Sequence, residues 1–212
     1  MTDISTDISG YRYDQADLNS SHDYLLPTVF RLLDGLHLPT GERRLFELGC
    51  GNGSVAHALT QRGWDITGVD PSAEGIAQAH RAYPDLKLYS GSAYDDLAAQ
   101  YGQFPVVISL EVVEHVYSPR HYAATVFSLL HGGGNAILST PYHGYWKNLA
   151  MALSGKMDAH FTALWDHGHI KFWSIRTLSV LLEEVGFRDL QFERVGRIPP
   201  LAKSMIAVAQ RP

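Results

Sequence analysis

Two carboxylates and an imidazole stand within five residues of one another in the stretch SLEVVEHV, residues 109 to 116. They are Glu111, Glu114 and His115, and they follow the apolar run FPVVI. If the chain turns helical after Leu110, Glu111 shares a face with Glu114 and His115 at spacings of three and four residues. Carboxylates this close raise each other's pKa unless a cation lies between them. A divalent metal ion would supply that cation.

A second group of ionisable residues lies further along, in WDHGHIKFW at 165 to 173. His167 and His169 could both return to the rim that carries the first group, and the residues alone leave the choice between them open. Oxygen ligands with one or two imidazoles suit Mg²⁺ or Mn²⁺ better than a metal that prefers thiolates. The alternative needs no metal: Glu111 lines a cofactor pocket, while Glu114 and His115 cap a helix.

The most specific motif is ELGCGNGSVAHAL, residues 47 to 59. Gly49, Gly51 and Gly53 follow an expected strand and open an expected helix, so the backbone can turn tightly and present amides to a ligand. A dinucleotide fingerprint requires its third glycine three residues after the second, whereas the spacing here is two. An acid, Glu47, also stands two positions before the first glycine. The spacing therefore disfavours NAD-dependent oxidoreduction.

A further carboxylate, Asp70, ends the next expected strand in TGVDPS. A carboxylate at this place in a doubly wound fold can accept hydrogen bonds from both hydroxyls of a ribose. The alternative is that Asp70 caps a helix, but Ser72 is available for that role. The two motifs together favour a nucleoside ligand without a pyrophosphate.

Short apolar runs and helical stretches alternate five times from residue 44 onward, which indicates a parallel sheet with helices on both faces. A further helix at 174 to 187 precedes two strands joined by a short link, which permits an antiparallel pair. The expected strands are RLFEL, WDITGV, LKLYS, FPVVISL, NAILSTP, RDLQFERVG and SMIAVAQ. We therefore expect an α/β fold with a doubly wound, Rossmann-like sheet.

Two segments stand outside this alternation. Residues 1 to 43 hold a polar stretch and an amphipathic helix at 22 to 36 that we expect to form a helical cap, and residues 44 to 212 form the main domain. An insert at about 142 to 173 is too long for a simple connection, which is typical of a lid or a substrate-binding segment. Its aromatic and methionine side chains could line an apolar pocket. These are Tyr142, Tyr145, Trp146, Met151, Met157, Phe161 and Trp165.

Composition excludes several classes of protein. A formal charge of −5 gives no general attraction to phosphate backbones, so a nucleic-acid partner is not expected. The single cysteine, Cys50, cannot form an internal disulfide, and no apolar run reaches the length of a transmembrane segment. The polar first twenty residues lack the pattern of a secretory signal. We expect a cytoplasmic protein.

Four motifs resemble, in order and spacing, those of the class I S-adenosylmethionine-dependent methyltransferases. They are ELGCGNG, GVDPS, LLHGGGNAILSTP and EEVGF. The resemblance runs from about Arg44 to the end. It implies a seven-stranded sheet, mostly parallel with an antiparallel last strand. It also implies that Gly49, Gly51 and Gly53 flank the methionine part of the cofactor, that Asp70 holds the ribose, and that Ser92 with Ala93 meets the adenine. Members of the family often have Asp where Ser92 stands.

Within that family, one pattern resembles that of two groups of metal-dependent O-methyltransferases. The pattern consists of Glu111, Glu114 and His115 followed by a later histidine. One group methylates the 3′-terminal 2′-hydroxyl of small RNAs, and the other makes ubiquinone precursors. The second has a segment similar to HGHIKFWSIRTL. The resemblance implies His169 as the later ligand, whereas the presence of His167 is a departure from the pattern.

We therefore expect an S-adenosylmethionine-dependent O-methyltransferase acting on a hydroxyl of a small molecule that is quinol-like, aromatic or a sugar. Glu111, His115 and His169 are the expected catalytic residues. Mg²⁺ or Mn²⁺ would bind the hydroxyl and lower its pKa. The alternatives are an RNA 2′-O-methyltransferase, a metal-independent small-molecule methyltransferase and a non-catalytic cofactor-binding module. A non-catalytic cofactor-binding module would not need the ionisable residues at 111 to 115.

Overall fold

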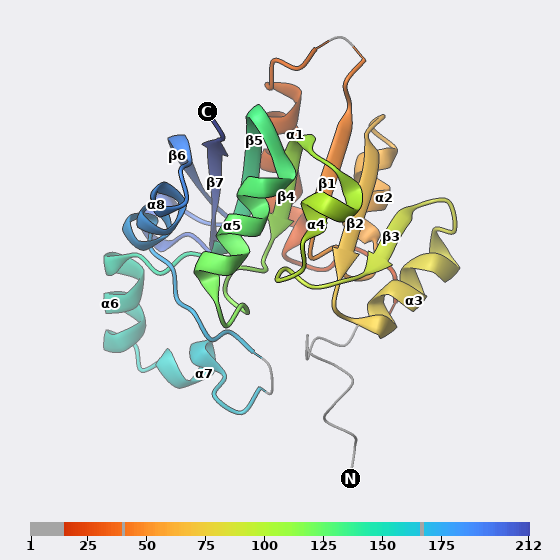
Figure 1. Ribbon diagram of the computed structural model, residues 1–212. Helices are drawn as coiled ribbons and strands as arrows, with labels where there is room; N and C mark the ends of the chain where they lie inside the picture. Colours follow the sequence, from red (N-terminus) through yellow and green to blue (C-terminus); the bar gives the residue numbers. More distant parts are fainter. Residues whose placement is uncertain (1–14, 40, 166–167) are drawn as a thin grey trace.

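A computed structural model describes residues 15–39, 41–165 and 168–212 of the protein (Figure 1). The helices are α1 (His22–Asp34), α2 (Ser54–Thr60), α3 (Ala73–Ala82), α4 (Leu97–Tyr101), α5 (Pro119–Leu129), α6 (Tyr145–Leu153), α7 (Met157–Phe161), α8 (Ile175–Glu184) and the 3₁₀ helix η1 (Pro199–Leu201). The strands are β1 (Arg44–Leu48), β2 (Asp65–Asp70), β3 (Lys87–Ser90), β4 (Phe104–Leu110), β5 (Leu130–Pro141), β6 (Arg188–Val195) and β7 (Ser204–Gln210).

The seven strands form one sheet in the order β3-β2-β1-β4-β5-β7-β6. Strands β1 to β5 pair in parallel, and β7 is antiparallel to both of its neighbours, β5 and β6. This arrangement confirms the expected doubly wound, mostly parallel sheet with an antiparallel last strand. Every expected strand is present. Strand β5 begins five residues before the expected run NAILSTP, because LHGGG is also extended.

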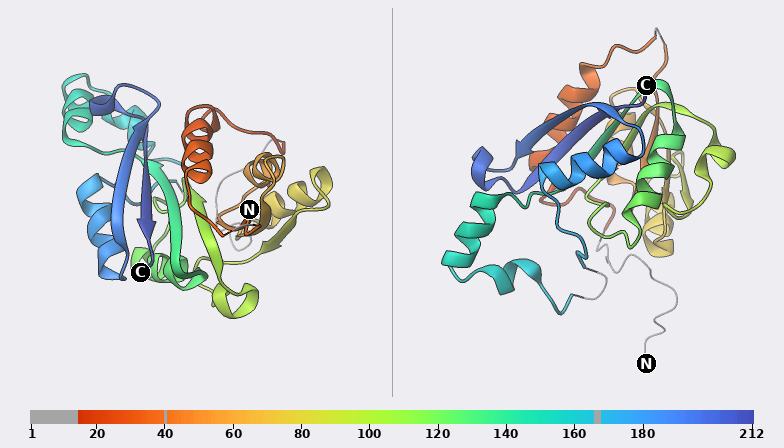
Figure 2. Two further views of the ribbon diagram at one scale, coloured as in Figure 1. Left: turned by 90° about the horizontal axis from the view of Figure 1, so that it is seen from above. Right: turned by 60° about the vertical axis from the view of Figure 1, so that its left-hand side comes forward.

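Two hydrophobic clusters cover the two faces of the sheet, because successive strand residues point to opposite sides. On one face, Leu45 and Val106 pack with buried residues of α1, α2 and α3. On the other, Phe46 and Val107 pack with buried residues of α5 and α8. Figure 2 shows the helices divided between the two sides of the sheet. Strand β4 is buried along its whole length, as expected for a central parallel strand.

The connections that follow β1, β2, β4 and β5 all leave from the carboxyl ends of parallel strands, so they gather at one edge of the sheet. In doubly wound folds this edge holds the ligand, at the point where the strand order reverses. Here the reversal lies between β1 and β4. The insert that carries α6 and α7 lies at the same edge, in the lower part of Figure 1. In the described residues, no helix is both long and apolar enough to span a membrane.

The packing of α8 and the loop after it gives a test of this core. Phe187 is fully buried, and its ring meets that of Phe127 edge to face with centroids 5.1 Å apart. We expect Phe187→Ala to lower the free energy of unfolding by about 3 to 5 kcal/mol, measured by urea denaturation. Val180→Ala, at an exposed position of α8, is the control and should change it by no more than about 0.5 kcal/mol. Equal effects of the two substitutions would contradict this packing.

Candidate active site

The loop between β1 and α2 has a backbone that only glycine adopts readily. Gly49, Gly51 and Gly53 have φ angles of +88°, +49° and +76°. A Cβ atom at Gly49 would collide with the Val112 side chain, and one at Gly53 would lie 2.9 Å from Cβ of Ala79. The three glycines therefore permit both the left-handed turns and the close approach of the segment after β4.

Asp70, at the end of β2, is buried and holds this loop. Its Oδ2 accepts a hydrogen bond from the Gly51 amide at 2.9 Å, and its Oδ1 accepts one from the Ser72 amide at 2.8 Å. Ser72, not Asp70, caps α3 by accepting from the Gly75 amide at 3.1 Å, as the sequence suggested. The Asp70 carboxylate is thus fixed against the glycine loop before any ligand binds.

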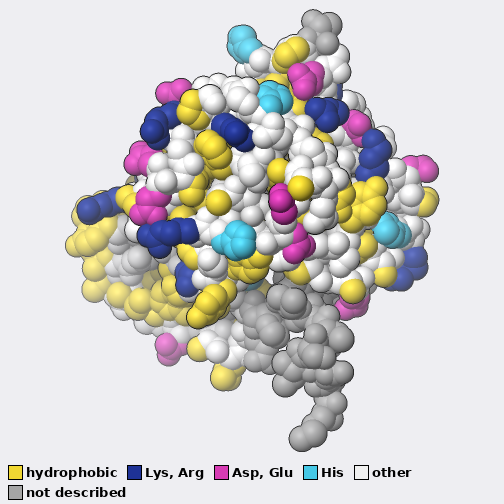
Figure 3. Space-filling view, viewed as in Figure 1, with side chains coloured by type: hydrophobic (Ala, Val, Ile, Leu, Met, Phe, Trp, Pro, Cys, Tyr) yellow, Lys and Arg dark blue, Asp and Glu magenta, His cyan; other side chains and the backbone are white. Residues whose placement is uncertain are grey.

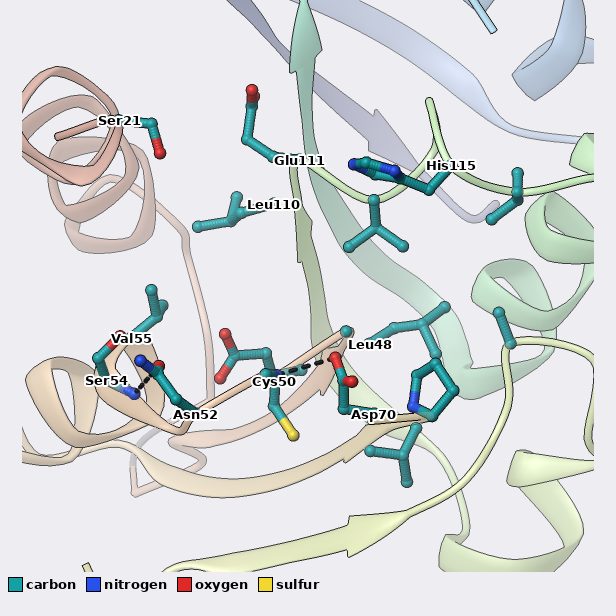
Figure 4. A pocket seen from close by; sticks show the side chains of 18 of the residues that line it. Ser21, Leu48, Cys50, Asn52, Ser54, Val55, Asp70, Leu110, Glu111 and His115 are labelled. Atoms are coloured by element: carbon teal, nitrogen blue, oxygen red, sulfur yellow. Dashed lines mark hydrogen bonds between the residues drawn. The ribbon is translucent and has the colours of Figure 1, made fainter. Parts of the chain in front are cut away.

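A cavity of about 440 Å³ opens beside this loop. Figure 4 shows Asp70, Cys50 and Asn52 along one side of it, with Ser21, Glu111 and His115 facing them. Most of the residues expected to bind the cofactor line the cavity, whereas Gly53, the N-cap of α2, is not among its lining residues. The lining residues from that set are Glu47, Gly49, Gly51, Asp70, Ser92, Ala93 and Glu111.

Burial changes the pKa of the Glu47 carboxyl group. Its pKa is raised well above the usual value, first by burial and second by the charge of Asp70. Its Oε2 has no hydrogen-bond partner among the described residues. A cationic group of a ligand would therefore be attracted to this end of the cavity.

The segment after β4 is not helical, so the expected placement of Glu111 on a helix face is wrong. The chain makes turns from residue 111 to 118, and α5 begins only at Pro119. Glu111 has a φ of +56°, a left-handed conformation that is uncommon for any residue but glycine. A contact distant in sequence holds this conformation: the Glu111 amide donates to both the carbonyl and the hydroxyl of Ser139, at 3.1 and 3.0 Å.

Two hydroxyls hold the Glu111 carboxylate. Ser139 Oγ donates to Oε1 at 2.8 Å, and Ser204 Oγ donates to Oε2 at 3.3 Å. Burial raises the pKa of Glu111 to about 7, while these two hydrogen bonds and the charge of Lys147 act in the opposite direction. A group with a pKa near neutrality at a cavity wall can exchange a proton with a ligand.

The other three predicted ligand residues come together. Glu114, His115 and His169 each offer a ligand atom, and these atoms lie within 4.8 Å of one another. Glu111 does not belong to this group, and His167 lies outside the described residues. The imidazole rings of His115 and His169 have centroids 4.8 Å apart. Burial, followed by the nearby His115 and His160, lowers the pKa of His169 to about 4, which leaves its imidazole neutral at pH 7.

Glu114 is the centre of this group and is 0% exposed. Neither of its carboxylate oxygens has a hydrogen-bond partner among the described residues. Burial and then the charge of Glu111 raise its pKa well above the usual value. The Glu114 backbone carbonyl also accepts hydrogen bonds from the amides of Ile170 and Lys171, at 2.9 and 3.0 Å. The same residue therefore supplies an unpaired carboxylate and brings His169 to it. A divalent cation fits this set of donors.

The insert contributes less to the cavity than the sequence suggested. Of its aromatic and methionine residues singled out above, only Trp165 lines the cavity. Tyr145 and Trp146 on α6 are 73% and 64% exposed. Figure 3 shows hydrophobic side chains gathered on the surface in this region, over α6. Tyr145 and Trp146 therefore do not line the cavity, whereas Trp165 does.

Sequence reasoning also missed several residues of the site. Asn52 and the segment from Asn19 to His22 belong to it, as do the two serines that hold Glu111. Asn52 stands inside the glycine motif, so the motif could have identified it as a residue of the site. Ser139 and Ser204 carry no signal, because they meet Glu111 only through strand pairing.

Known proteins with similar sequences and folds agree with this geometry. A family model described as a methyltransferase domain matches residues 19–191. A ubiquinone biosynthesis O-methyltransferase of Ruegeria sp. is 33% identical over 72% of this chain and 63% of its own length. The protein of that name from Cereibacter sphaeroides is 36% identical over 56% of this chain and 49% of its own. The chain thus spans about half to two thirds of these curated relatives.

Two solved structures share the fold. A possible histamine N-methyltransferase of Thermotoga maritima matches with a TM-score of 0.63 and 17% identity, covering 90% of this chain and 91% of the other. A phosphoethanolamine N-methyltransferase of Haemonchus contortus, solved with S-adenosylmethionine, matches with a TM-score of 0.62 and 13% identity. That match covers 89% of this chain and 53% of the other.

Asp70 provides the first test of the cofactor site. Asp70→Ala should weaken the binding of S-adenosylhomocysteine by about 1 to 3 kcal/mol, because a charged acceptor for the ribose and the support of Gly51 are both lost. Isothermal titration calorimetry measures the effect. Asp65→Ala is the control, since Asp65 begins the same strand, is exposed and pairs only with Lys87. Unchanged affinity in Asp70→Ala would refute the assignment.

Proposed function

Because the chain belongs to the class I S-adenosylmethionine-dependent methyltransferases, we propose that it methylates a hydroxyl oxygen of a small molecule with the help of a divalent metal ion. The observation that carries the proposal is the unpaired, buried carboxylate of Glu114 beside His115 and His169, and these two histidines line the cavity. The printed names of the relatives support oxygen as the acceptor atom.

Mg²⁺ or Mn²⁺ held at this site would supply positive charge that lowers the pKa of the substrate hydroxyl and fixes its direction. Glu114, His115 and His169 would hold the ion. Glu111 stands next to them but is bonded to two serines, so we assign it a separate role. It accepts the proton of the hydroxyl, for which a pKa of about 7 is suited. Orientation of the oxygen toward an already activated methyl group is then the main remaining task.

The acceptor we propose is phenolic or quinol-like. Trp165 and Tyr94 line the cavity together with Val112, Val116 and Leu110, which gives the walls an aromatic and aliphatic character. The relatives named for ubiquinone biosynthesis point to the same class of acceptor. An RNA acceptor is disfavoured, because the chain has a formal charge of −5 and none of the described lining residues is lysine or arginine.

The metal is tested by substitution of Glu114 with its isosteric amide. Glu114→Gln should lower both metal affinity and methyl transfer by about 100-fold or more, equivalent to about 3 kcal/mol. The assay compares turnover of a catechol acceptor after chelation and after addition of Mg²⁺, Mn²⁺ or Zn²⁺. Binding of S-adenosylhomocysteine should stay within about twofold of wild type, because the glycine loop and Asp70 are separate contacts. Glu183→Gln, an exposed carboxylate on α8, is the matched control.

Two results would contradict the metal proposal. One is full wild-type turnover in excess chelator, and the other is undiminished metal affinity in Glu114→Gln. Full turnover in excess chelator, together with a loss of turnover in Glu114→Gln, would favour the metal-independent alternative. In that alternative, Glu114, His115 and His169 act by acid and base chemistry.

The insert provides a further test. We propose that residues 143–165 form a cover that becomes ordered when substrate binds, because α7 has no buried residue and α6 exposes Tyr145 and Trp146. Amide hydrogen exchange in this segment should slow when cofactor and acceptor are both present. Helix α5, whose side chains belong to the core, serves as the internal reference and should not change. Equally strong protection of the segment with and without ligands would make it a fixed part of the fold.

A further inference from the structure

Basic side chains from the insert and from the turn after β6 meet at one place. We term them the basic cluster, and they are His143, Lys147, His160 and Arg197. Helix α6 packs against η1, which brings the turn to the insert, and Figure 2 shows α6 beside the turn that joins β6 to β7. The imidazole rings of His143 and His160 have centroids 5.2 Å apart. Burial, followed by the charges of Lys147 and Arg197, lowers the pKa of His160, so all four side chains are neighbours.

Lys147 is a buried member of the cluster. It is only 7% exposed, and its Nζ donates a hydrogen bond to the Lys203 carbonyl at 3.1 Å. In the described part of the chain, this amino group forms no ion pair. Burial, followed by the charge of Arg197, lowers the pKa of Lys147 to about 8, while the charge of Glu111 acts in the opposite direction. At pH 7, Lys147 is therefore a buried cation with N–H donors that no described residue uses.

The side chains around Lys147 do not neutralise its charge. Burial, followed by the charge of Lys147, lowers the pKa of His143 to about 4, so this imidazole is neutral at pH 7. The rings of Phe161 and Phe172 have centroids 6.0 and 5.0 Å from that of His143. Arg197 adds a second positive charge. A cation buried among apolar and neutral groups is costly unless an anion pairs with it.

The cluster adjoins the residue that we propose as the base. Lys147 bonds to the Lys203 carbonyl, and the next residue, Ser204, donates to Glu111 Oε2 at 3.3 Å. Glu111 itself is a poor counter-ion for Lys147, because serine hydroxyls hold both of its oxygens and its pKa of about 7 leaves it partly protonated at neutral pH. A group attached to a substrate at Glu111 would therefore lie close to an unneutralised cation.

A purely structural role for Lys147 explains less. In that case, the side chain would only tie α6 to the residue before β7 through the Lys203 carbonyl. A neutral donor would form the same hydrogen bond without the cost of a buried charge. The positive charge is of use where an anion comes to it.

We propose that the basic cluster binds a carboxylate of the methyl acceptor, with Lys147 Nζ as the main donor, while the hydroxyl that receives the methyl group lies at Glu111. This inference rests on the proposed function, since it takes a phenolic acceptor at Glu111. It adds an acidic substituent to that acceptor, and the substituent selects the substrate while the hydroxyl reacts. No lysine or arginine occurs among the described residues that line the cavity, so the adjoining cluster is the place where an anion is stabilised.

The test compares two probes of nearly the same shape, 3,4-dihydroxybenzoate and 3,4-dihydroxybenzamide. Calorimetry is done on the full chain at pH 7 with saturating S-adenosylhomocysteine and Mg²⁺. Wild type should bind the benzoate about tenfold more tightly than the benzamide, the difference expected for hydrogen bonds between charged groups. Lys147→Met, which keeps the length of the side chain without its charge, should reduce this preference to less than about twofold. Any contribution of the metal ion to the preference remains in the variant, so the loss reports on Lys147.

Three further variants complete the design. Lys147→Arg keeps the charge and should keep part of the preference. Arg197→Gln, at an exposed position in the turn, should lower the preference about twofold and tests the cluster even if Lys147→Met does not fold, which thermal unfolding checks. Lys156→Met, an exposed lysine of the same insert, is the matched control and should keep the full preference. The ratio of kcat/KM values for the two probes should follow the ratio of affinities in each variant.

The outcomes separate this inference from the proposed function. If wild type binds and methylates both probes without preference, or if Lys147→Met weakens both equally, the role of the cluster is overturned and the proposed function stands. Tighter binding of 3,4-dihydroxyphenylphosphonate than of the benzoate would assign the cluster to a phosphate-type group and overturn the carboxylate. If S-adenosylhomocysteine binds but neither probe binds or is methylated, the phenolic acceptor of the proposed function fails, and this inference fails with it.

Discussion

A buried carboxylate without a partner at the end of a central parallel strand is the constraint on which the site depends. Removal of such a group from water costs several kcal/mol unless it is neutralised, hydrogen-bonded or bound to a cation. Neither oxygen of Glu114 has a hydrogen-bond partner among the described residues, and ligand atoms of His115 and His169 lie within 4.8 Å of the carboxylate. The imidazole of His169 is neutral at pH 7, so it does not balance a negative charge. Protonation of Glu114 or a bound cation would remove the cost of burying that charge, and a cation would also use the ligand atoms of the two histidines.

Two other carboxylates at this edge of the sheet are, by contrast, already hydrogen-bonded by the protein itself. Asp70 is held by the amides of Gly51 and Ser72, and Glu111 by the hydroxyls of Ser139 and Ser204. These contacts join strands that are distant in sequence, so they are fixed by the sheet and need no ligand to form. The cofactor half of the cavity is therefore preorganised, which lowers the conformational entropy lost on binding. The carboxylates of Glu47 and Glu114 differ, because they keep oxygens without a hydrogen-bond partner among the described residues.

The sequence predicted the sheet well and the local geometry after β4 poorly, and each outcome has a physical cause. Strands that are buried on both faces read as nearly continuous apolar runs, so FPVVISL and SMIAVAQ match β4 and β7 residue for residue. Glu111, by contrast, adopts a left-handed φ because Ser139 captures its amide, and no local pattern reveals a partner 28 residues away. The grouping of Glu114 and His115 with a later histidine was predicted from residue types, whereas the choice of His169 came from the resemblance to metal-dependent O-methyltransferases. The segment from Asn19 to His22 was not predicted as part of the site, because polar side chains such as Asn19 and Ser20 resemble those of any surface segment.

The position of His169 links the insert to the chemistry. This histidine lies on the insert, yet its place beside Glu114 is set by two hydrogen bonds from Ile170 and Lys171 to the Glu114 carbonyl. Trp173 adds a third link, since its Nε1 donates to the Val113 carbonyl at 3.1 Å. The metal-ligand group is thus shared between the core of the sheet and a segment that closes over its edge. Binding of the proposed cation and docking of the end of the insert would then favour each other, because each would stabilise the geometry that the other requires.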